Sequence, residues 1–99
     1  MNIEALTRFA DSDNDFRLTK IDSKRENWNV PVGRVTSGGF NIHTWEASDD
    51  KPEQKAVEII GRGFSYLRTS PIVRLVDQDE KSTIFETEGG FYKLEKLDD

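Results

Sequence analysis

Residues 72–97, IVRLVDQDEKSTIFETEGGFYKLEKL, carry the clearest structural pattern of the chain. Three runs rich in β-branched and aromatic residues are separated by two short turns: the runs are 72–76, 83–88 and 91–97, and the turns are 77–81 and 89–90. Such runs are typical of strands, and short polar or glycine turns join antiparallel neighbours. The pattern therefore predicts an antiparallel meander of three strands.

The middle run also predicts how the sheet divides into faces. In a strand, alternate side chains point to opposite sides, so Thr83, Phe85 and Thr87 share one side. Ile84 and Glu86 share the other side. At most one side of this strand is strongly apolar, which is typical of an antiparallel sheet with one face on a core.

Two stretches nearer the N-terminus carry further strand signals. Residues 16–21 alternate and predict a first strand. Residues 28–46 predict a hairpin, because two alternating runs flank Gly38-Gly39, a pair that permits a tight turn. Pro31 lacks a backbone donor and places the first of these runs at a sheet edge or at the beginning of a strand.

Helix signals are fewer. Residues 2–10 predict a short helix, and residues 48–61 fit a helix that Ser48 caps and Gly61 ends. The competing interpretation of the second stretch is a strand over residues 57–60, where β-branched residues dominate. We expect a β-rich α+β fold over residues 1–99: an antiparallel sheet or a small partly open barrel, with a C-terminal three-strand meander and one or two short helices.

Length and composition exclude several classes of protein. The chain has 99 residues, which is enough for one domain, and no cysteine, which excludes disulfide scaffolds, thiolate zinc sites and cysteine nucleophiles. Neither an export signal nor a long apolar run is visible. We expect a cytoplasmic protein that does not bind a membrane, and the sequence leaves its oligomeric state open.

The charge balance argues against direct nucleic-acid binding. Nineteen acidic residues against fourteen basic ones give a net charge of −5, which repels a phosphate polyanion. Residues 49–99 hold twelve acids and eight bases, so most of the excess lies in the C-terminal half. One alternative function is an acidic mimic of nucleic acid, of the kind that some phage inhibitors use, although lysines interrupt the acidic residues.

Motifs for catalysis or metal binding are sparse. His43 is the only histidine, and no serine lies in a Gly-x-Ser-x-Gly turn. Residues 11–22 resemble the calcium loop of an EF-hand, but Phe16 replaces the glycine of its sharp turn and Asp22 replaces the longer glutamate. We therefore expect no metal, no cofactor and no enzymatic activity. A small enzyme that joins His43 to a carboxylate remains the second alternative.

Aromatic and basic residues give the best candidates for a binding surface. Trp45 falls on the strand face opposite Phe40 and Ile42, so it is the best candidate for an exposed anchor. In a strand over residues 64–68, the side chains of 64, 66 and 68 share one face. The sequence predicts a small interaction or regulatory module that binds a partner protein, with five contact residues: His43, Trp45, Arg62, Tyr66 and Arg68.

Overall fold

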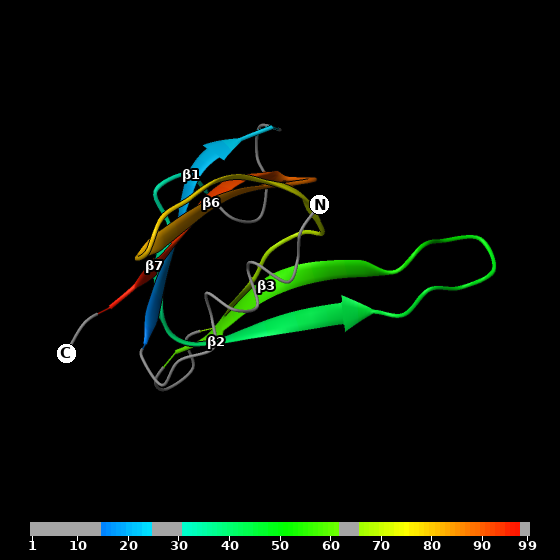
Figure 1. Ribbon diagram of the computed structural model, residues 1–99, viewed down its shortest axis with the longest axis horizontal. Helices are drawn as coiled ribbons and strands as arrows, with labels where there is room; N and C mark the ends of the chain where they lie inside the picture. The colour runs from blue at the N-terminus through cyan, green and yellow to red at the C-terminus, as the bar shows by residue number, and fades with distance from the viewer. Residues whose placement is uncertain (1–14, 25–30, 62–65, 98–99) are drawn as a thin grey trace.

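The computed structural model describes residues 15–24, 31–61 and 66–97, and Figure 1 shows the arrangement of their strands. All regular secondary structure among these residues is β-strand, and none of it is helix. The seven strands are β1 (Phe16–Ser23), β2 (Val35–Trp45), β3 (Gln54–Ile60), β4 (Tyr66–Arg68), β5 (Ile72–Gln78), β6 (Ser82–Thr87) and β7 (Gly90–Lys96). None of the described residues belongs to a helix that has the length and hydropathy needed to cross a bilayer.

The strands form one open antiparallel sheet in the order β4-β3-β2-β1-β7-β6-β5. The predicted C-terminal meander is confirmed, because β6 pairs with both β5 and β7. The predicted first strand is also confirmed as β1, which lies between β2 and β7. Phe16 lies buried in this regular strand, so residues 16–22 do not adopt the loop of an EF-hand.

The two faces of β6 differ as the sequence predicts. Thr83, Phe85 and Thr87 are fully buried, whereas Ile84 and Glu86 are only partly buried. Phe85 stacks on Tyr92 of β7, with ring centroids 5.7 Å apart. The meander therefore places one face on the core and leaves the other in contact with solvent.

The predicted hairpin over residues 28–46 is wrong, because no turn forms at Gly38-Gly39. β2 continues through both glycines, pairing with β1 up to Gly38 and with β3 from Gly39 onward. A Cβ atom on Gly38 would lie 2.3 Å from the carbonyl oxygen of Ile60. The glycine is needed for this close approach of two backbones, and not for a reversal of the chain.

The hairpin that does form joins β2 to β3 through residues 46–53. Its register pairs Trp45 with Gln54, and a bridge between Ser48 and Lys51 lies within the connecting loop. Figure 1 shows β2 and β3 extending away from the other strands toward this loop. The helix considered for residues 48–61 is therefore wrong, and the competing strand interpretation of residues 57–60 is confirmed as part of β3.

The local sequence explains this outcome. Ala56, Val57, Glu58 and Ile59 are buried in succession, so both faces of β3 are covered. A strand that is buried on both sides shows no clean alternation, and a short apolar run then fits a helix equally well. The helix predicted over residues 2–10 lies outside the described residues.

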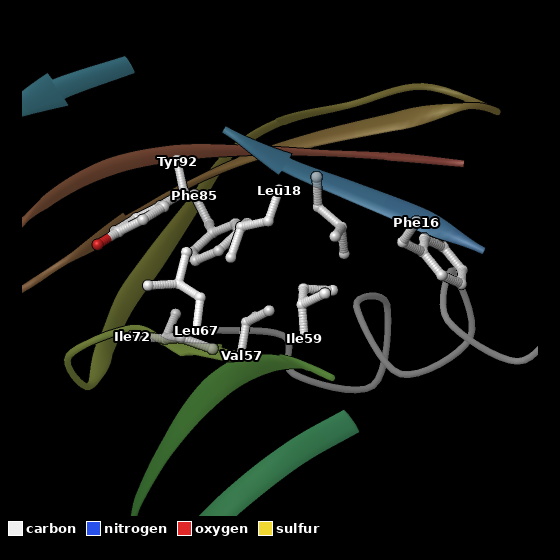
Figure 2. Close-up of a cluster of buried hydrophobic side chains, with 9 residues drawn as sticks. Phe16, Leu18, Val57, Ile59, Leu67, Ile72, Phe85 and Tyr92 are labelled. Atoms are coloured by element: carbon white, nitrogen blue, oxygen red, sulfur yellow. The ribbon is translucent and has the colours of Figure 1, made fainter. Parts of the chain in front are cut away.

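The core lies between two parts of the bent sheet. We call the part formed by β2 from Gly39 onward, β3 and β4 the arm. Side chains of the arm face those of β1, β6 and β7, as Figure 2 shows. The buried apolar cluster comprises Phe16, Leu18, Val57, Ile59, Leu67, Ile72, Phe85, Tyr92 and Leu94.

The sheet does not close into a ring. Its two edge strands, β4 and β5, follow each other in sequence and are not paired with each other. Residues 69–71 connect them, and this connection is fixed at both ends: Thr69 donates its N–H to the carbonyl of Val57, and Glu88 donates to the carbonyl of Pro71. The chain thus passes from the arm to the meander, and no other described strand pairs with the outer side of β4 or β5.

Candidate functional site

Alternation along β2, β3 and β4 gives the arm two different faces. Val57, Ile59 and Leu67 point into the core and are buried. The strand register places a second set of side chains together on the opposite side, which we call the arm face. It comprises Asn41, His43, Trp45, Ala56, Glu58, Ile60, Tyr66 and Arg68.

Trp45 lies at the centre of an aromatic and cationic cluster on this face. The His43 ring meets it edge to face, with centroids 4.7 Å apart and an interplanar angle of 76°. The Arg68 guanidinium lies over the indole, with Cζ 5.3 Å from the ring centroid. Ala56 is fully buried opposite His43, and its small side chain leaves room for Arg68 to reach across β3. Two neighbours thus hold Trp45 in place.

Arg68 also lies within contact distance of the histidine. Its Nη1 lies 3.4 Å from His43 Nε2. A guanidinium can only donate a hydrogen bond, so Arg68 is the donor in this contact. Among the described residues no carboxylate lies within ion-pair distance of Arg68, and the side chain is exposed. Most of its five N–H donors therefore face solvent.

Glu58 anchors the middle of the face. Asn41 Nδ2 donates to one carboxylate oxygen and the Tyr66 hydroxyl donates to the other, each at 2.7 Å. The hydrogen bond from Tyr66 and then that from Asn41 lower the pKa of Glu58 against the opposing effect of burial. The hydrogen bond between Tyr66 and Glu58 also raises the pKa of Tyr66.

These pKa directions bear on the chemistry available to the site. A general acid or base works best when its pKa lies near the operating pH. The pKa of Glu58 is displaced downward and that of Tyr66 upward, away from neutrality in both cases. Glu58 therefore stays ionised and Tyr66 stays neutral, which suits a structural hydrogen-bond network better than proton transfer.

Apolar surface continues along the face beyond this network. Ile60 is 57% exposed and Tyr66 is 47% exposed, and the two residues are paired in register on β3 and β4. Together with Trp45 and Arg68 they give the arm face large aromatic and apolar groups beside a cation. Tryptophan, tyrosine and arginine are the residue types enriched at the energetic centres of protein interfaces.

Four of the five residues predicted from the sequence lie together on the arm face: His43, Trp45, Tyr66 and Arg68. Arg62 lies outside the described residues. Alternation in the sequence already places Asn41 on the same side of the strand as His43 and Trp45, although it was not among the five predicted contacts. Sequence reasoning missed Glu58, because its place depends on the pairing of β3 with two other strands.

The remaining observations add neither a metal centre nor a relative. In the described ranges, no group of three histidine or acidic side chains is arranged to hold a metal ion. No protein-family model, curated protein or solved structure matches the chain.

Proposed function

We propose that this protein is a small non-catalytic interaction module that binds a partner protein through the arm face. The observation that carries the proposal is Trp45, which His43 and Arg68 hold on the outer side of an extended two-strand projection. A large aromatic side chain beside an arginine is a typical anchor of a protein interface.

Preorganisation of the face supports this proposal. Ordering a long side chain on binding costs about 0.5–1.5 kcal/mol. Arg68 is already held by Trp45 and His43, and Tyr66 is already held by Glu58. Much of this ordering cost is therefore incurred on folding and does not reduce the affinity for a partner.

Capture from an extract of the source organism, comparing the wild-type chain with two alanine variants, tests the proposal. Trp45→Ala removes the anchor of the arm face. Phe91→Ala is the matched control, because Phe91 is a partly buried aromatic residue on β7, outside the arm. We expect Trp45→Ala to lose a specifically captured protein that Phe91→Ala retains, with circular dichroism showing that both variants fold. Capture that Trp45→Ala leaves unchanged would contradict the proposal.

Salt separates this function from nucleic-acid mimicry. Binding driven by carboxylates weakens steeply as ionic strength rises, while an aromatic anchor responds little. We expect capture of the partner to change little between low and moderate salt. A steep loss, together with sensitivity to removal of Asp49 and Asp50 in the loop at residues 46–53, would favour the mimic instead.

A further inference from the structure

Among the described residues, no strand pairs with the outer edge of β4, which lies directly beside the arm face. β4 is the last strand of the sheet order, and in the part of the chain that the structure describes it pairs with β3 alone. Thr69 donates its N–H to Val57, and bonded and non-bonded pairs alternate along an antiparallel ladder. The backbone of Leu67 therefore faces β3, and the N–H and C=O groups of Tyr66 and Arg68 face the free edge.

The side chains of the same two residues lie on the arm face. Tyr66 is about half exposed, and Arg68 is exposed. The charge of Arg68 acts on the neighbouring Glu58, but among the described residues no carboxylate lies within ion-pair distance of Arg68. A guanidinium matches a carboxylate in a bidentate pair, and the contacts with Trp45 and His43 limit the motion of Arg68. Backbone donors and acceptors thus lie beside a cation that is positioned to receive an acidic group.

We propose that the partner supplies an extended segment that adds as a strand to the free edge of β4 and places one acidic side chain on Arg68. This inference rests on the proposed function and specifies its ligand. Strand addition to an exposed sheet edge is an established mode of peptide recognition, in which the backbone supplies affinity and alternate side chains supply specificity. A single acidic residue fits better than an acidic run, because the net charge of −5 repels a polyanion.

The opposite edge of the sheet is a poorer template. β5 pairs with β6 through two register shifts, at Ile72/Arg74 and at Leu75/Asp77. Such irregularities interrupt the row of backbone groups and protect an edge from strand addition. Arg74 on this strand is already paired with Glu86 at 2.6 Å. Strand addition with recognition of a carboxylate is therefore specific to β4.

Selection from a phage-displayed library of short random peptides on the immobilised wild-type chain tests the inference. We expect selected peptides to share one acidic residue within an otherwise β-branched or aromatic sequence. Changing that residue to its amide should weaken binding to the wild-type chain by about tenfold, the value of one well-formed charged contact. The same change should have little effect on Arg68→Ala. Arg17→Ala is the matched control, because Arg17 is an exposed arginine on β1.

Backbone pairing has its own measurement. Addition of a strand to β4 should slow amide hydrogen exchange at Tyr66 and Arg68 when the selected peptide binds, because their N–H groups become hydrogen-bonded. Exchange at Leu67, whose N–H faces β3, should change less. Unchanged exchange at both edge residues would overturn strand addition.

The outcomes separate this inference from the proposed function. Peptides that lack an acidic residue, or a library that yields no binder, would overturn the inference while the capture experiment with Trp45→Ala still decides the proposed function. Peptides whose binding is indifferent to both Trp45→Ala and Arg68→Ala would contradict the arm face itself.

Discussion

Gly38 and Gly39 are adjacent in β2, but an added Cβ atom would clash with another backbone at Gly38 and not at Gly39. A Cβ at Gly38 would come within 2.3 Å of the Ile60 carbonyl oxygen and 2.6 Å of the Gly61 Cα, at a φ of +157°. We expect Gly38→Ala to lower the free energy of unfolding by about 1–3 kcal/mol, because backbone atoms must move to admit the methyl group. Denaturant unfolding followed by circular dichroism measures this loss.

Gly39→Ala is the control for that substitution. The nearest atom to a Cβ at Gly39 lies 4.0 Å away, which is ordinary contact. We expect a change within about 0.5 kcal/mol. Equal losses of stability in the two variants would contradict a special role for the close approach of the Gly38 backbone to Ile60 and Gly61.

The two tyrosines of the chain differ in what surrounds their hydroxyl groups. Burial raises the pKa of Tyr92 to about 12, from an ordinary value of 10.0. In Tyr66→Phe the remaining tyrosine should therefore ionise near pH 12, as measured by the ultraviolet absorbance of phenolate. The raised pKa stabilises the fold below pH 10, and this contribution is lost as the pH rises from 10 toward 12. Ionisation near pH 10 at full folding would contradict the burial of Tyr92.

At the scale of the strand, Glu58 of β3 links three strands, because its carboxylate accepts hydrogen bonds from Asn41 of β2 and Tyr66 of β4. We expect Glu58→Gln to lower the free energy of unfolding by about 1–3 kcal/mol at neutral pH. The amide keeps one acceptor for Tyr66 but turns an N–H donor toward the donor of Asn41. Thermal unfolding at constant pH measures the loss.

The pH dependence of the same variant gives a second readout. Because the folded pKa of Glu58 lies below its ordinary value of 4.5, its contribution is complete above that value and is lost as the pH falls through the folded pKa. Glu58→Gln should therefore lose less stability on acidification than the wild-type chain. Glu53→Gln is the control, because Glu53 is 51% exposed and its ion pair with Lys55 is worth little. If the wild-type chain and Glu58→Gln lose the same stability on acidification, the hydrogen bonds from Asn41 and Tyr66 to the Glu58 carboxylate are contradicted.

A strand can be predicted from the sequence when one of its faces is buried and the other is exposed, because its residues then alternate between apolar and polar. The meander was predictable because one face of β6 is buried and the turns around it are short. β3 was ambiguous because both of its faces are covered, and β2 was misassigned because a glycine pair signals a turn and a close backbone approach equally well.

The candidate site follows the same logic. Alternation placed Trp45 and His43 on one side of a strand, and the same rule placed Tyr66 and Arg68 together. Local sequence carries no information about which strands are neighbours in the sheet. His43 and Trp45 meet Tyr66 and Arg68 across Ala56 only because β3 pairs with both β2 and β4. The same long-range pairing places Glu58 between them, so both features required the structure.

At the scale of the whole molecule, the arm and the rest of the sheet share one core, although β2 is the only described strand that pairs with strands of both parts. Ile59 of the arm is fully buried in the same cluster as Leu18 and Phe85. A shared core couples the two parts more strongly than a single bent strand does, so we expect them to unfold together.

Ile59→Ala tests this coupling, and Ile60→Ala controls for it on the same strand. Removing the buried side chain should cost about 2–5 kcal/mol. The fluorescence of Trp45, read in a Trp28→Phe background, and the near-ultraviolet signal of Tyr92, read in a Tyr66→Phe background, should shift to lower denaturant by the same amount. Ile60 is 57% exposed, so its truncation should cost about 0.5 kcal/mol or less. If Ile59→Ala moves the fluorescence transition and leaves that of Tyr92 in place, the arm folds separately, and the rigid face on which partner binding depends loses its support from the core.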